Sequence, residues 1–144
     1  MAKTLEEALQ QMTLVSNDVE YAIAHLPARA TTAAASIVAE VGDPFCALIV
    51  DKDEVTLVLP AHLIDEFGAR LPSDFVHTQR YRLITFDVVL DMGIIGLMAQ
   101  LSDALAQANI SILTYAAFSR DHLLVPAVQF DAAMNALEHL KQAK

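Results

Sequence analysis

Two glycines and one aspartate are the residues of this chain whose types and spacing could recognise a small ligand. The 144 residues include only four glycines, and Gly93 and Gly96 stand three apart in the stretch LDMGIIGLMAQLSDAL. Both lie where a strand-like run ends and a helix-like run begins. A helix N-terminus has unpaired amides and about half a positive charge, and glycine lets a ligand approach the backbone. The pair therefore predicts a carboxylate-binding loop.

An α-amino acid also carries an ammonium group, and Asp121 is the natural residue to counter it. Asp121 lies in the polar break Arg120-Asp121-His122, between two β-rich runs. Asp91 either contributes to this site or only caps the helix. Two structural alternatives stay open. The glycines can serve only a tight turn and close helix–strand packing, and Asp121 can be an ordinary solvated turn residue.

The elements that would position these residues follow the same order twice along the chain. In the second half a strand, a helix, two strands and a helix are predicted at residues 81–90, 94–108, 110–118, 123–127 and 131–141. In the first half the same order is predicted at residues 19–26, 31–40, 45–50, 55–60 and 60–68. The capping-box pattern Thr4-Leu-Glu-Glu7 adds a short helix at residues 4–12.

This repeated order predicts an α+β fold of two modules, residues 13–78 and 79–144, joined near residues 71–78. Strands separated by helices on one face favour a ferredoxin-like layout. The second half ends at Lys144 without an obvious fourth strand. We hypothesise that a strand near residues 12–15 fills that position.

Composition excludes several classes of function. The formal charge is −9 with nine Lys and Arg residues in total, scattered without a basic stripe, which argues against nucleic acid and anionic membranes. No apolar run is long enough to span a membrane, and the N-terminus lacks a signal-peptide pattern, so we expect a cytoplasmic protein. One cysteine, Cys46, and five separated histidines give no metal-ligand pattern. With no nucleophile–base pair either, we expect neither an enzyme nor a cofactor.

The segment DMGIIGLMAQLSDALAQANISILTYAAFSRDHLLVP, residues 91–126, resembles the second repeat of tandem ACT-domain proteins. These include small uncharacterised bacterial proteins and the cytosolic arginine-sensor family of animals. The shared features are a glycine-containing loop into a helix, A-x-I-S opening a strand, a loop ending in Asp-His, then L-V-P and a final helix. The upstream FCALIVDKDEVTLVLP is similar to the hairpin of the first repeat. The similarity covers residues 19–140.

The resemblance implies tandem βαββαβ modules with antiparallel sheets, which pair side by side and bind small molecules, usually amino acids, at their interface. In the arginine sensors the loop glycine and the acid of the Asp-His turn contact the ligand; here these are Gly96 and Asp121. The implied site then comprises these two residues and their neighbours: Gly93, Ile94, Ile95, Leu97, Ala116, Ala117 and Phe118. Ala116 and Ala117 replace the hydroxyl residues of many family members, which leaves the ligand open.

A homodimer is expected from the same reasoning, because one pair of repeats leaves sheet edges and apolar faces uncovered. The strand start at Asn109 and Ile110 of a neighbouring module would form the other wall of the site. The competing interpretation is a structural or interaction module that pairs with another protein and has no ligand of its own.

Overall fold

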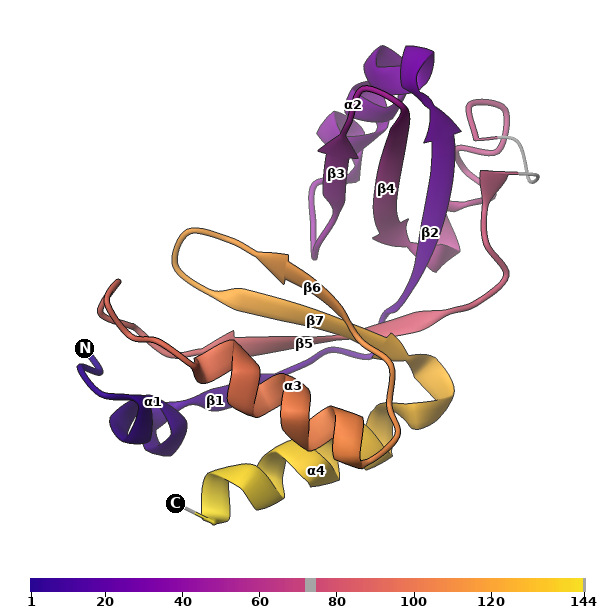
Figure 1. Cartoon of the computed structure of the whole chain (residues 1–144). Helices are drawn as coiled ribbons and strands as arrows, with labels where there is room; N and C mark the ends of the chain where they lie inside the picture. The colour runs from indigo at the N-terminus through magenta and orange to yellow at the C-terminus, as the bar shows by residue number, and fades with distance from the viewer. Residues whose placement is uncertain (72–74, 144) are drawn as a thin grey trace. The chain divides into compact units, whose positions relative to one another are not determined.

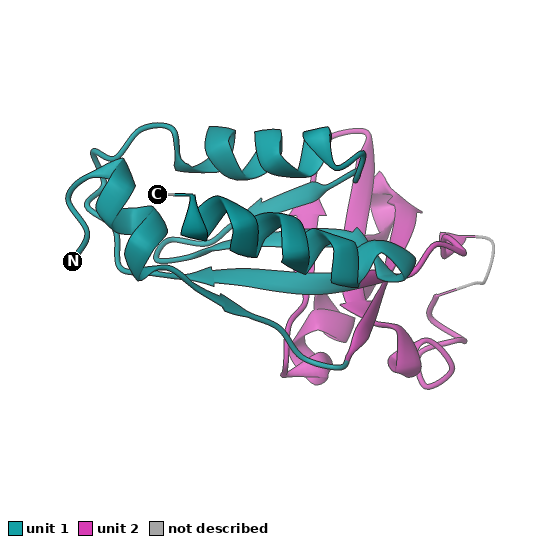
Figure 2. Ribbon diagram, turned by 90° about the horizontal axis from the view of Figure 1, so that it is seen from below, with its two compact units in different colours: residues 1–18, 82–144 teal, residues 19–81 magenta. Residues whose placement is uncertain are grey.

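The computed structural model describes residues 1–71 and 75–143, and the chain divides into two compact units. Unit 1 combines residues 1–18 with 82–144, and unit 2 comprises residues 19–81 (Figure 2). The N-terminal segment therefore belongs to the same unit as the C-terminal half. The module boundaries at residues 13–78 and 79–144 stay a prediction, and part of the junction predicted at 71–78, like Lys144, lies outside the described residues.

Unit 1 has a four-stranded sheet with helices on one face (Figures 1 and 2). Its strand order is β1-β5-β7-β6, and its elements are α1 (Leu5–Gln11), β1 (Thr13–Val15), β5 (Tyr81–Asp87), α3 (Leu97–Gln107), β6 (Leu113–Ala116), β7 (Asp121–Pro126) and α4 (Phe130–Gln142). β1 pairs antiparallel with β5, and β6 pairs antiparallel with β7. The hypothesis of a strand near residues 12–15 is confirmed: β1 occupies the fourth position of this sheet.

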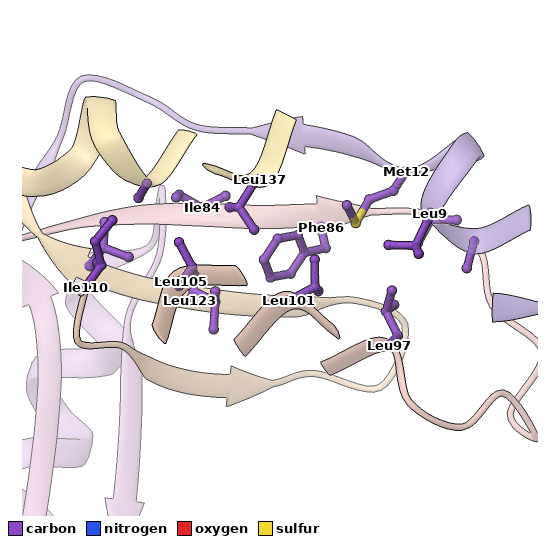
Figure 3. Close-up of a cluster of buried hydrophobic side chains, with 14 of the residues drawn as sticks. Leu9, Met12, Ile84, Phe86, Leu97, Leu101, Leu105, Ile110, Leu123 and Leu137 are labelled. Carbon is purple, nitrogen blue, oxygen red and sulfur yellow. The ribbon is translucent and has the colours of Figure 1, made fainter. Parts of the chain in front are cut away.

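The core of unit 1 lies between the helices and the sheet (Figure 3). The helical spacing of Leu97, Leu101 and Leu105 puts all three on one face of α3, where each is at most 5% exposed. They pack in one cluster with Phe86 of β5 and Leu123 of β7. Burying each side chain of this kind contributes about 1.5–3 kcal/mol, so this cluster holds α3 against the sheet.

The N-terminal helix α1 begins as its sequence predicts. The Thr4 side chain accepts a hydrogen bond from the Glu7 amide at 3.1 Å, and a Glu7 carboxylate oxygen accepts one from the Lys3 amide at 2.9 Å. Leu9 of α1 is fully buried in the core of unit 1. The capping pattern and the apolar face therefore agree on the same short helix.

Unit 2 repeats part of this plan, with β2 (Glu20–Pro27), α2 (Thr31–Val41), β3 (Ala47–Val50) and β4 (Glu54–Pro60) in the strand order β3-β4-β2. The hairpin predicted from residues 45–60 is confirmed by the antiparallel pairing of β3 with β4. Beside β2, an antiparallel bridge joins Ala24 to Val76, and the His77 amide donates to the Ile23 carbonyl at 2.9 Å. This bridge stands at the position that β1 fills in unit 1.

The helix predicted at residues 60–68 is wrong. A 3-10 helix at Ala61–Leu63 is followed by turns, and the Gly68 amide bonds the Asp65 carbonyl three residues back. Phe67 and Leu71 are 5% and 1% exposed in the core of unit 2. These two residues are four apart, and the Leu71 amide still donates to the Phe67 carbonyl at 2.9 Å, so their burial needs only single helical turns and not a continuous helix.

Candidate functional site

The loop between β5 and α3 is held by the N-terminal segment of the same unit. The Ala2 amide donates to the Val89 carbonyl at 2.8 Å, and the Asp91 amide donates to the Ala2 carbonyl at 2.9 Å. Ala2 itself is fully buried. Two backbone hydrogen bonds from a buried residue therefore fix the position of the loop that the sequence singles out.

The two loop glycines have different structural roles. Gly96 is the residue before α3, with a φ of +98°, and a Cβ built on it would lie 3.5 Å from Leu5 Cδ2. Gly93 has no such φ; its amide donates to Asp91 Oδ1 at 2.9 Å. Asp91 thus closes the turn around Gly93, and the Gly93 amide already has a partner. Only Gly96 needs the left-handed backbone that glycine tolerates.

A cavity of about 390 Å³ opens between this loop and the turn that joins β6 to β7. Its volume falls in the range of small-molecule sites, about 300–1,000 Å³. Most of its lining is apolar, from residues of both loops and the ends of β5 and α3: Phe86, Val88, Val89, Leu90, Asp91, Met92, Ile94, Leu97, Ala117, Phe118, Ser119, Arg120 and Asp121. All of these residues belong to unit 1.

The charged groups of the cavity come from both loops. Arg120 Nη1 lies 3.9 Å from Asp87 Oδ1, and each of these side chains is 52% exposed. The Asp121 carboxylate makes no hydrogen bond or ion pair with residues 1–71 or 75–143. One guanidinium and the carboxylates of Asp91 and Asp121 therefore line the same apolar cavity.

Large apolar side chains surround this cavity and are exposed to solvent. Val89, Met92 and Ile95 of the first loop are 68%, 81% and 88% exposed, and Phe118 of the second is 89% exposed. The Ala117 amide donates to the Arg120 carbonyl at 2.9 Å, which closes the turn that presents Phe118. We call these four residues the apolar rim. Such a concentration of exposed apolar side chains is typical of a binding surface.

Of the predicted site residues, the cavity brings together Ile94, Leu97, Ala117, Phe118 and Asp121. Gly93, Ile95, Gly96 and Ala116 adjoin these residues in sequence but are not part of its lining.

Asn109 and Ile110 lie at the opposite end of α3 from the cavity. Asn109 has a φ of +61°, and the Ile110 amide donates to the Leu105 carbonyl at 3.0 Å. The Asn109 amide donates to the Ala106 carbonyl, also at 3.0 Å. This pair of bonds is a Schellman motif, so within unit 1 these two residues end the helix.

Sequence reasoning missed Arg120 as part of the site and Asp87 as the partner of Arg120. Arg120 was visible only as one residue of the polar break around Asp121. The available signal was a cation directly beside the predicted acid, together with an aspartate at the end of an apolar strand. The two residues are 33 positions apart in the sequence, and only the folded sheet, in which the end of β5 lies beside the start of β7, brings their charges together.

His122 follows the predicted acid but faces the other way, because successive side chains of a strand alternate between its faces. Its Nδ1 lies 2.8 Å from the Thr85 hydroxyl oxygen on the neighbouring strand β5. Burial, with the nearby Arg120 charge adding to it, lowers the pKa of His122, and Asp121 opposes this shift. His122 and Asp121 therefore do not form an acid–base pair.

A metal site and a reactive cysteine are both disfavoured in the described part of the chain. Within residues 1–71 and 75–143, no group of three or more His, Cys, Asp or Glu side chains could hold a metal ion. Cys46 is half-buried, and burial raises the pKa of its thiol, which disfavours the reactive thiolate. No helix in those ranges has the length and hydropathy that crossing a bilayer requires.

The arrangement of strands and helices in unit 1 agrees with a comparison of the sequence with known families. Residues 76–139 match the ACT domain. The matched segment includes the whole of β5, α3, β6 and β7 and most of α4, and with them every residue that lines the cavity. The ACT domain is a small-molecule-binding regulatory domain. Among curated proteins, no sequence matches this chain.

Solved structures extend the similarity to nearly the whole chain. A Vibrio cholerae protein of unknown function, described as a possible transport protein, is 25% identical with a TM-score of 0.73 over 95% of both chains. An Agrobacterium tumefaciens protein is 22% identical with a TM-score of 0.70, over 90% of this chain and 89% of that one. The ligand-free regulatory subunit of aspartate kinase from Thermus thermophilus is 13% identical with a TM-score of 0.70, over 90% and 97%. The chain therefore has the ACT ferredoxin-like fold, with mixed helices and antiparallel sheet.

Proposed function

We propose that this protein is a regulatory protein that binds an amino acid in the cavity of its ACT domain. The observation that carries the proposal is the cavity itself, which is lined by apolar side chains and holds carboxylates and a guanidinium. A site that binds a zwitterion needs one positively and one negatively charged group, and an apolar wall favours the side chain of the bound amino acid. The match to the ACT domain, and the likeness to a regulatory subunit, support the same function.

The proposed site comprises the residues that line the cavity together with the neighbouring Gly93, Ile95, Gly96 and Ala116. We further propose that a second module completes it, in a homodimer, with Asn109 and Ile110 of that module as the other wall. The apolar rim supports this proposal because a second module would remove it from water. β6 also supports it: β6 is an edge strand of the sheet, with Leu113 37% exposed. The cytoplasmic location expected from the sequence stays a prediction.

Thermal denaturation with each of the twenty amino acids tests the proposal. A ligand present at about 100 times its Kd stabilises the folded state by about 2.7 kcal/mol, which raises Tm by about 5–10 °C. Asp121→Ala should abolish this shift. Asp53→Ala is the matched control, because it removes the same charge from an exposed turn outside the cavity. A full set of twenty amino acids at millimolar concentration without any shift would exclude amino-acid sensing.

The second candidate is an interaction module that pairs with another protein without a ligand. The apolar rim and the exposed edge of β6 favour it, since both suit a polypeptide partner. The same screen separates the two functions. Retention of a partner protein in pull-downs, with no amino acid shifting Tm, favours the interaction module.

A further inference from the structure

The lining of the cavity includes one cationic side chain, Arg120, and the position of this side chain bears on how a ligand would be oriented. Two amides of the first loop are already occupied, since those of Gly93 and Ile94 donate to Asp91, and neither Gly93 nor Gly96 lines the cavity. Arg120 does line it. A guanidinium presents several N–H donors in a plane that matches a carboxylate. Arg120 is thus the one cationic side chain of the lining.

The present partner of Arg120 does not prevent this role. Its Nη1 is 3.9 Å from Asp87 Oδ1, which is too long for a hydrogen bond, and both side chains are half exposed. Exposed ion pairs of this kind contribute little, about 0–1 kcal/mol. A ligand carboxylate that accepts hydrogen bonds from Arg120 would therefore gain more than the loosened pair with Asp87 loses.

We propose that Arg120 is the carboxylate anchor of the cavity and that the ligand is an α-amino acid with an uncharged, apolar side chain; this rests on the proposed function. Asp121 then accepts hydrogen bonds from the ligand ammonium. A ligand with a second carboxylate would meet the negative charges of Asp87, Asp91 and Asp121, which repel it. The apolar lining takes the side chain, because removing its surface from water is favourable, whereas the ammonium group of a lysine side chain would lose its hydration there.

Calorimetric titration of L-leucine, L-lysine, L-aspartate and L-leucinamide tests the anchor and the ligand class together. We expect the wild type to bind leucine at least tenfold more tightly than lysine or aspartate. Arg120→Gln should weaken leucine binding about tenfold, at the low end for a charged hydrogen bond because Arg120 is half exposed. Arg29→Gln, the same substitution at an exposed position in unit 2, should leave the affinity unchanged.

Leucinamide separates the anchor from a general effect of charge. It keeps the ammonium and the side chain but has no carboxylate, so the wild type should bind it about tenfold more weakly than leucine. If Arg120 holds the carboxylate, Arg120→Gln should bind leucinamide as the wild type does. An equal loss for leucine and leucinamide on Arg120→Gln would overturn the anchor.

The failures of the two proposals are distinguishable. Tighter binding of lysine or aspartate than of leucine overturns the ligand class while amino-acid binding stands. Wild-type affinity for leucine in Arg120→Gln overturns the anchor while the site stands. If none of the twenty amino acids binds, the proposed function and this inference fall together.

Discussion

The two loop glycines should respond very differently to the same substitution. Gly96 has a φ of +98°, and a methyl group there would meet Leu5 Cδ2 at 3.5 Å, an ordinary contact. Gly93 has no positive φ, and its new Cβ would lie 3.3 Å from Asp91 Oδ1. Replacing Gly96 by alanine therefore tests backbone strain, whereas replacing Gly93 tests only a close contact with one side chain.

The expected changes in the free energy of unfolding follow from these two backbone environments. A left-handed backbone costs a residue other than glycine about 1–3 kcal/mol. Alanine also restricts the unfolded chain, which returns about 0.4–1 kcal/mol. The free energy of unfolding of Gly96→Ala should thus fall by about 1–2 kcal/mol. For Gly93→Ala the entropic gain and the tight contact nearly cancel, so the change should stay within about 0.5 kcal/mol.

Urea denaturation followed by far-UV circular dichroism measures both changes. Gly42→Ala is the matched control in unit 2, because Gly42 has a φ of +71° and no atom within 4 Å of its built Cβ. It should lose stability as Gly96→Ala does, through the backbone alone. The reasoning is refuted if Gly93→Ala destabilises the protein as much as Gly96→Ala. It is also refuted if Gly96→Ala leaves the free energy of unfolding unchanged.

Three further substitutions test the fold and its charges. Leu101→Ala removes a fully buried side chain of α3 and should cost about 2–5 kcal/mol in urea unfolding, whereas a loss under about 1 kcal/mol would mean that α3 is misplaced. Thr4→Ala removes the cap of α1 and should cost about 0.5–2 kcal/mol, with Thr4→Ser close to wild type. The pKa of His122 is lowered in the folded state, so the unfolded chain binds its proton first and stability falls as pH is lowered from roughly 7.5 to 5.5. In His122→Gln, thermal denaturation at these two pH values should show a smaller loss of stability than in the wild type. An unchanged pH dependence would refute the assignment of this loss to His122.

Most elements of the fold were predictable from the sequence, because their apolar spacing agrees with what they bury. The stripe that includes Leu97, Leu101 and Leu105 predicted α3, and the same residues lie in the core of unit 1. The segment at residues 60–68 was mispredicted because Pro60 and Gly68 mark the start and end of helical turns but do not show whether those turns join into one α-helix.

The candidate site was only partly predictable. The loop around Gly96 and the turn at Asp121 could be chosen from residue types, and the structure puts residues of both around one cavity. The hydrogen bond from the Gly93 amide to Asp91 could not be predicted from the sequence, because an aspartate in a turn either caps its own loop or faces a ligand. Arg120 and Asp87 were missed because their approach depends on the ends of β5 and β7 lying together, which residue spacing does not encode.

The position of the N-terminal segment would let the loop of the proposed site bind a ligand with little loss of conformational entropy. Ala2 holds the loop through hydrogen bonds to Val89 and Asp91, and Leu5 lies against Gly96. β1 then continues this segment into the sheet beside β5. A loop fixed by its own fold does not have to be ordered when the ligand arrives, so more of the interaction energy appears as affinity. The segment that completes the sheet of unit 1 therefore also preorganises the loop of the proposed site.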